Sequence, residues 1–319
     1  MESNANPYRD RFLSIDQVQR GFEAAGYVCG RAIATTLYVG CHLNKPILVE
    51  GPAGVGKTEL ANVMAAYLGV PLIRLQCYEG LDESKALYEW KYGKQLLYTQ
   101  ILRDRMNDLV KGVDGLEAAM DRLHQYDDVF FSINFLEPRP LLKALQEKGG
   151  AVLLIDEVDK SDPEFEAFLL EILSDFQVSI PEIGTLKAAS TPFVFLTSNN
   201  TREMSEALKR RCLHLYIPFP DPKIERAIVR MKVPAVPELL RSQLVSFIHQ
   251  VRNLDLKKAP SVSETIDWAR VLLLLHAEVL TPDLVQETLN VFLKFEQDVE
   301  VVTARIPELT LKSTREFPV

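Results

Sequence analysis

The 319-residue sequence has little cysteine and histidine, a deficit of basic residues and no long apolar run. Its four cysteines stand singly, which excludes a disulfide-rich scaffold and predicts reduced, buried thiols. The five histidines have no partner at metal-ligand spacing, so a transition-metal site is not expected. With 44 acidic and 36 basic residues the net charge is −8, so the protein has no overall positive field to hold nucleic acid. The composition does not exclude a local basic channel.

The sequence shows no pattern typical of a membrane protein. Residues 1–7 lack a basic-then-apolar leader, and no apolar stretch approaches the ~20 residues that span a bilayer. We therefore expect a cytoplasmic protein without membrane insertion. The length allows one large or two modest domains, and a hydrophobic content of 47% indicates a globular chain with a sizeable core.

A glycine-rich phosphate loop is the strongest motif present, because residues 51–58 match the pattern G-x-x-x-x-G-K-[ST]. The apolar residues 46–50 before it suit a buried parallel strand, and a helical pattern follows it. Backbone N–H groups of such a loop, with the helix dipole, bind a polyphosphate. We therefore predict ATP and Mg²⁺ as cofactors, with Lys57 on the β- and γ-phosphates and Thr58 on the metal. The predicted nucleotide contacts are Gly51, Pro52, Ala53, Gly54, Val55, Gly56, Lys57, Thr58 and Glu59.

Two adjacent carboxylates follow the next clear apolar strand, residues 151–155. Asp156 is predicted to hold the Mg²⁺ shell, and Glu157 to polarise the attacking water. Both can project into the ligand crevice at the carboxyl end of a parallel strand. The alternative is that they are ordinary helix-capping acids. The second acid favours ATP hydrolysis over mere nucleotide binding.

Polar residues also end the strand at 192–197, where an amide can hydrogen-bond both a γ-phosphate oxygen and the lytic water. Asn199 is the chosen candidate and Asn200 its near competitor, although asparagines here are also ordinary turn formers. Farther on, Arg211 can reach the γ-phosphate bound by a neighbouring subunit, and Arg210 is the alternative for that role. A basic helical turn that complements the helix dipole is the simpler interpretation of both arginines.

Five short apolar or β-branched runs separated by helical patterns predict an α/β domain with a parallel five-stranded sheet. These runs are residues 46–50, 71–76, 151–155, 192–197 and 213–218. The long gap after the second run predicts a helical insertion at about 80–135, and a Pro/Gly turn between alternating segments predicts a hairpin at about 177–188. We therefore expect an ATPase core over 1–220, a helical lid over 221–298 and a tail over 299–319 that either packs on a neighbour or is irregular.

The order of these features resembles that of the AAA+ ATPases over roughly residues 15–297: the phosphate loop, acids 156–157, Asn199 and Arg211, then an all-helical segment. Four segments are similar to the MoxR family, in its CoxD-like branch: 78–82 (YEGLD), 86–90 (ALYEW), 140–145 (PLLKAL) and 165–170 (FEAFLL). The resemblance implies a homo-oligomer, a hexameric ring, that hydrolyses ATP to remodel or mature a protein client such as a metalloenzyme. It also implies a partner with a von Willebrand factor A domain.

Two features leave the function less defined. MoxR-type lids carry a sensor arginine early in the third lid helix, but here the first arginine of that stretch is Arg270, one to two turns later. The aromatic segment 78–92 could grip a polypeptide in the centre of the ring or pack in the core. The alternatives to a remodelling ATPase are a nucleic-acid motor or loader, made less favourable by the acidic charge, and a non-hydrolysing ATP switch.

Overall fold

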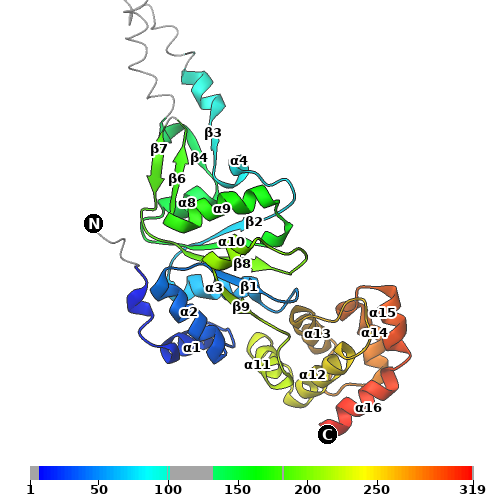
Figure 1. The fold of residues 1–319 in the computed structure, drawn as a ribbon. Helices are drawn as coiled ribbons and strands as arrows, with labels where there is room; N and C mark the ends of the chain where they lie inside the picture. Colours follow the sequence, from blue (N-terminus) through cyan, green and yellow to red (C-terminus); the bar gives the residue numbers. More distant parts are fainter. Residues whose placement is uncertain (1–6, 99, 101–131, 182, 318–319) are drawn as a thin grey trace, which may run out of the picture.

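The computed structural model of the protein describes residues 7–98, 100, 132–181 and 183–317. Within this part, a five-stranded parallel sheet runs in the order β2-β5-β8-β1-β9 (Figure 1). Its strands are β1 (Ile47–Glu50), β2 (Leu72–Gln76), β5 (Val152–Asp156), β8 (Phe193–Ser198) and β9 (Leu213–Tyr216). The predicted parallel five-stranded sheet is confirmed.

Helices cover both faces of this sheet, because side chains of each central strand alternate between two cores. In β5, Leu153 and Ile155 join the core on one face, whereas Val152 and Leu154 join the core on the other. The first core includes α8 (Pro140–Gln146), α9 (Pro163–Asp175) and α10 (Glu206–Arg211). The second includes α1 (Ile15–Ala24), α2 (Arg31–Leu43) and α3 (Lys57–Leu68), which follow the short turn η1 (Arg9–Arg11).

Parallel pairing brings the polar carboxyl ends of the strands to one edge. Asp156 lies beside Gln76 of the neighbouring strand, and Glu50 lies beside Ser198. The short turn η3 (Val158–Lys160) follows β5 directly at this edge. The loops that leave this edge therefore lie close to one another, although they come from distant parts of the sequence.

Two small sheets flank the main one. The predicted hairpin is formed by β6 (Gln177–Ile180) and β7 (Gly184–Lys187), which pair antiparallel. After α4 (Glu83–Ala86), β3 (Tyr88–Trp90) pairs with β4 (Leu136–Pro138), which the turn η2 (Ile133–Phe135) precedes. The helices predicted for the insertion lie mostly at 101–131, outside the described residues.

The aromatic segment divides into packed and exposed residues. Tyr88 and Trp90 pack against the core of the α8–α9 face, with their rings edge to face at 5.9 Å. Tyr78 and Tyr92 are exposed. Two of the four rings therefore pack against the core while remaining partly exposed, and the other two are exposed to solvent.

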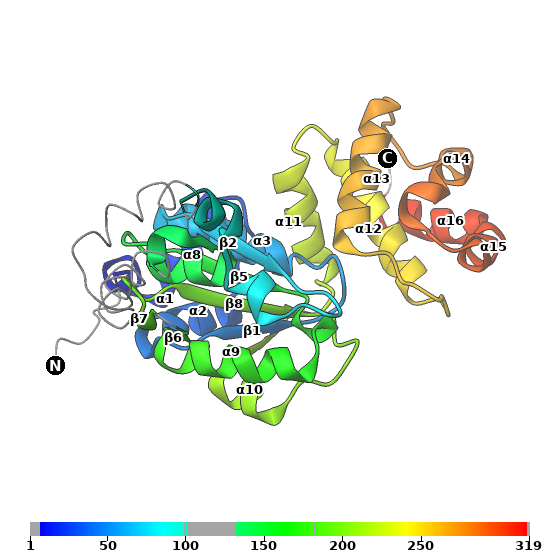
Figure 2. The same cartoon turned by 90° about the horizontal axis from the view of Figure 1, so that it is seen from above.

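The helical part contains α11 (Pro222–Lys232), α12 (Glu238–Arg252), α13 (Val262–Leu274), α14 (Pro282–Phe292), α15 (Glu296–Thr303) and α16 (Ile306–Glu316). We call residues 222–317 the lid. The lid has its own core around the fully buried Trp268, and Figure 2 shows α11 and α13 facing the α/β part. No helix among the residues placed here combines the length and apolar character needed to cross a membrane.

The carboxyl-terminal residues 299–317 are helical and belong to this core, which differs from the irregular end considered from the sequence. Val302, Ile306 and Leu309 are buried, and Ser246 of α12 donates a 2.6 Å hydrogen bond to Glu316. The buried face of α16 also contains Thr310 and Ser313. Because these two residues are polar, the sequence shows no clear apolar periodicity for this helix.

The four cysteines are all buried as free thiols, as predicted. Burial raises the pKa values of Cys29, Cys77 and Cys212 to about 12. These thiols are therefore protonated and unreactive at neutral pH.

Candidate nucleotide site

The phosphate loop connects β1 to α3 and depends on backbone conformations that favour glycine. Gly51, Gly54 and Gly56 have φ values of 149°, 73° and 97°. A Cβ on Gly51 would also lie 2.1 Å from the carbonyl oxygen of Ile217. Helix α3 begins at Lys57, so the N–H groups of its first turn have no partner within the helix and face the loop. This arrangement fits the phosphates of a nucleotide.

Lys57 is held at this loop by three hydrogen bonds. Its ammonium donates to the carbonyl oxygens of Gly51 (2.7 Å) and Pro52 (2.8 Å) and to Oδ1 of Asn199 (2.8 Å). Burial lowers the pKa of Lys57, and the carboxylates of Asp159, Asp156 and Glu157 oppose that shift. The ammonium of Lys57 is thus held at the loop. A phosphate oxygen can bind it by replacing the carbonyl oxygens of Gly51 and Pro52 as hydrogen-bond acceptors.

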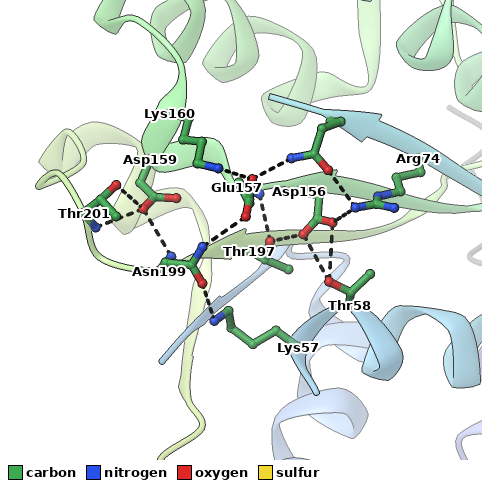
Figure 3. A network of polar contacts seen from close by, with 11 residues as sticks. Lys57, Thr58, Arg74, Asp156, Glu157, Asp159, Lys160, Thr197, Asn199 and Thr201 are labelled. Carbon is green, nitrogen blue, oxygen red and sulfur yellow. Dashed lines mark hydrogen bonds and ion pairs between the residues drawn. The ribbon is translucent and has the colours of Figure 1, made fainter. Parts of the chain in front are cut away.

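Thr58 and Asp156 form a pair of oxygen donors beside the loop (Figure 3). The Thr58 hydroxyl lies 3.3 and 3.4 Å from the two carboxylate oxygens of Asp156. The Thr197 hydroxyl donates to the same carboxylate, and Nη2 of Arg74 lies 2.5 Å from Oδ2. A hydroxyl and a carboxylate suit Mg²⁺ when phosphate oxygens and water complete its shell. These two residues therefore fit the predicted metal role.

Glu157 lies next to this pair in an unusual backbone conformation, with φ 55° and ψ 49°. Its carboxylate accepts hydrogen bonds from Gln76 (2.9 Å), Lys160 (2.6 Å) and Asn199 (3.2 Å). Its N–H donates to the Thr197 hydroxyl at 2.9 Å. A left-handed non-glycine residue costs on the order of 1–3 kcal/mol and is typical of functional sites. The carboxylate is linked to Lys57 through one residue, Asn199, which hydrogen-bonds to both.

Asn199 connects the acid and the lysine, because its amide donates to Glu157 and accepts from Lys57 (Figure 3). Its competitor Asn200 is exposed, and within the described part of the chain its side chain forms no hydrogen bond with this network. The structure thus brings Lys57, Thr58, Asp156, Glu157 and Asn199 together at one edge of the sheet, as the sequence predicted for a nucleotide site.

A buried aspartate that the sequence analysis missed fixes the position of Asn199. Oδ2 of Asp159 accepts hydrogen bonds from the N–H of Asn199 (3.2 Å), and from the N–H (2.9 Å) and hydroxyl (2.6 Å) of Thr201. Burial raises the pKa of Asp159, but the hydrogen bonds from Thr201 and Asn199 outweigh it and hold the pKa below its ordinary value. Asp159 is therefore an anion that orders the loop after β8.

Three further residues of the network are polar residues in otherwise apolar strands, and this pattern is a sequence signal for a site. Arg74 and Gln76 alternate on β2 and so point to the same face, toward Asp156 and Glu157. Thr197 is a buried hydroxyl near the end of β8. Their roles depend on which strands are neighbours, and the sequence does not state that.

The predicted arginines lie outside this network. Arg211 is exposed at the end of α10 and has no hydrogen-bond or ion-pair partner in the described part of the chain. Arg210 pairs with Glu206 at 2.8 Å on the same exposed helix. Arg270 is exposed and pairs with Asp267 at 2.9 Å, and none of its hydrogen bonds reaches the phosphate loop.

The site lies within residues 46–212, which match the family model described as AAA domain (dynein-related subfamily) and make up just over half of the chain. An uncharacterized protein of Staphylococcus haemolyticus is 25% identical over 239 residues, covering 73% of this chain and 77% of that protein. One from Staphylococcus epidermidis is 26% identical over 238 residues, covering 72% and 76%. A structure of the Thermotoga maritima RuvB Holliday junction branch migration motor is 16% identical, with a TM-score of 0.45, covering 97% of this chain and 84% of that one. A structural similarity at this level does not bear on the function.

Proposed function

Because the chain belongs to the dynein-related subfamily of the AAA domain family, we propose that it binds Mg²⁺–ATP in the site described above and hydrolyses it. The observation that carries this proposal is the convergence of a phosphate loop, a lysine, a hydroxyl–carboxylate pair and a second carboxylate at one edge of the sheet. A protein that only binds nucleotide has no need of Glu157 in a strained position beside the phosphate loop.

Each residue then has a separate task. Lys57 exchanges its carbonyl partners for β- and γ-phosphate oxygens, and Thr58 and Asp156 hold the metal, which neutralises phosphate charge when bound. Glu157 accepts the proton of the attacking water. Asn199, positioned by Asp159, orients that water and the γ-phosphate. Gln76 and Lys160 both donate to Oε2 of Glu157, whereas Oε1 accepts only from Asn199 among the described residues and can still accept a hydrogen bond from the water.

The active site is completed by a neighbouring subunit in this proposal. Arg211 lies away from the site of its own chain and has no partner among the described residues, so its guanidinium is available to another copy. An arginine supplied in trans stabilises charge on the transferred phosphoryl group. This favours a homo-oligomeric ring, for which we propose a hexamer.

The finer assignment is a MoxR-type ATPase of the CoxD-like branch. Its support is the similarity of segments 78–82, 86–90, 140–145 and 165–170 to that family, together with the hairpin β6–β7 before β8 and the helical lid. On this assignment the ring remodels or matures a protein client, a metalloenzyme being one candidate, with a von Willebrand factor A-domain protein as partner.

The proposal is tested by titrating a fluorescent ATP analogue and measuring phosphate release for the wild type, Lys57→Ala and Glu157→Gln. Lys57→Ala should lose affinity and turnover, because the ammonium stabilises both the ground state and the transition state. Glu157→Gln should keep affinity and lose turnover. Glu164→Gln, which changes an exposed acid on α9, is the matched control. Binding without phosphate release by the wild type would show an ATP switch instead, and equal loss of affinity in both site variants would refute the division of roles.

A further inference from the structure

The first turn of lid helix α13 lies against the apex of the phosphate loop. The N–H of Ser263 donates to the carbonyl oxygen of Gly54 at 3.2 Å, and its hydroxyl donates to the same oxygen at 3.3 Å. A second contact joins the lid to α3, where Lys232 lies 2.6 Å from Glu59. The lid therefore contacts both the loop that would hold the phosphates and the helix that follows it.

The sequence makes this N–H available. Ser261 caps α13 in a capping box with Glu264, which fixes the conformation of the first turn. Ser263 is the second helical residue, so its N–H has no acceptor within the helix. The carbonyl of Gly54 supplies the missing acceptor, although the two residues are 209 positions apart.

Two features favour glycine at position 54, one within the loop backbone and one at the lid. Its φ is 73°, and a Cβ would lie 2.5 Å from the hydroxyl oxygen of Ser261. The phosphate-loop pattern itself requires glycine at positions 51 and 56 but not at 54. At position 54, which the motif leaves open, the left-handed backbone of the loop and the close approach of the lid therefore both favour glycine.

The contact also sets the direction of the next N–H. A trans peptide is planar, so the carbonyl of Gly54 and the N–H of Val55 point in opposite directions. Because the carbonyl points to the lid, the N–H of Val55 points away from it, and it has no acceptor among the described residues. Phosphate loops bind anions through N–H groups that are free in this way.

We propose that Ser263 of the lid is a positioning residue for the Gly54–Val55 peptide, so that lid docking and phosphate binding strengthen each other. The proposal rests on nucleotide binding at the proposed site. Coupling between two equilibria is reciprocal: if Ser263 improves phosphate binding, bound phosphate strengthens the hydrogen bond of Ser263 by the same factor. The lid then responds to the nucleotide through the backbone of the loop, and this response does not require Arg270 of α13 to contact the nucleotide.

The test uses amide hydrogen exchange of the full-length wild type with and without a non-hydrolysable ATP analogue. Exchange at Ser263 should slow on binding, by roughly twofold to tenfold for one hydrogen bond. Asp283, the second helical residue of α14, is the matched control amide, and its exchange should not change. Binding with unchanged exchange at Ser263 would overturn this inference alone. Absence of binding would overturn the proposed function and the inference with it.

Substitutions give a second readout, the affinity for the fluorescent ATP analogue. Ser263→Pro removes both donors without breaking a hydrogen bond within α13, and should weaken binding roughly twofold to tenfold. Ser263→Ala removes only the hydroxyl and should have a smaller effect, whereas Ser263→Thr and the control Asp283→Ala should match the wild type. Equal affinity of Ser263→Pro and the wild type would contradict the positioning role.

Discussion

Arg74 neutralises the carboxylate that we assign to the metal, so removing this arginine should make Mg²⁺ easier to bind. Nη2 of Arg74 lies 2.5 Å from Oδ2 of Asp156, and the arginine side chain is 52% exposed while that of the aspartate is 4% exposed. Without Arg74, Asp156 would keep only the hydroxyl donors of Thr58 and Thr197. A buried carboxylate left in that state binds a cation more readily.

The size of the effect follows from the exposure of the pair. Two unit charges 4 Å apart interact by about 4 kcal/mol at an effective dielectric constant of 20. Solvent around the half-exposed guanidinium reduces this to on the order of 1 kcal/mol. That value corresponds to about a fivefold change in an equilibrium constant. Arg74→Gln should therefore lower the Mg²⁺ concentration for half-maximal binding of the ATP analogue about fivefold.

The assay is a Mg²⁺ titration of analogue fluorescence, with the melting temperature measured in parallel. In the absence of Mg²⁺ the variant should melt about 1–2 °C below the wild type, and Mg²⁺ with nucleotide should reduce this difference. Arg139→Gln is the control, because Arg139 is about as exposed as Arg74 and pairs with Glu89, an exposed carboxylate outside the site. An unchanged or higher Mg²⁺ requirement for Arg74→Gln would refute the reasoning.

Two further predictions follow from ion pairs at other positions. Lys160→Met should raise basal phosphate release, because it removes the 2.6 Å ion pair that restrains Glu157; slower release would show that Lys160 assists the acid instead. Glu225→Gln should destabilise the protein by about 3–5 kcal/mol in denaturant unfolding at pH 7, since Glu225 is fully buried against Arg252. Burial raises the pKa of Glu225, but the hydrogen bonds of His249 and Arg252 outweigh it and hold the pKa below its usual 4.5. The wild type should therefore lose this stability as the pH falls below about 4.5, and the variant should not show this loss; parallel pH profiles would contradict the prediction.

Local patterns predicted the parts of the site that lie next to each other in the chain. The phosphate loop needs glycines and a lysine at fixed spacing, and the acids at 156 and 157 directly follow an apolar strand. Asn199 follows the same rule, because it is an amide at the end of an apolar strand. Each of these residues lies at the sheet edge where the pattern placed it.

Contacts between distant segments could not be predicted in this way. Arg74 reaches Asp156 because β2 and β5 are neighbours in the sheet. The sequence of neither strand predicts which strand pairs with it. Asp159 meets Thr201 through the adjacency of two loops, and Ser263 meets Gly54 only when the lid docks. In each case a polar residue acquires its role from tertiary structure.

The central claim is that each ATPase site is shared by two subunits, and mixed oligomers test it most directly. Lys57→Ala should lack a working phosphate loop but still offer Arg211, whereas Arg211→Ala should bind ATP normally and hydrolyse it poorly. An arginine in trans is worth ~10³–10⁵ in rate in related chemistry, so each variant alone should be nearly inactive.

The measurement is phosphate release against the mixing ratio of the two variants after subunit exchange, with Arg210→Ala in place of Arg211→Ala as a parallel series. We expect activity to pass through a maximum near equal amounts, because an Arg211→Ala subunit receives the arginine of an adjacent Lys57→Ala subunit. Recovery only in the parallel series would transfer the role to Arg210. Proven exchange without recovery in either series would contradict the shared site.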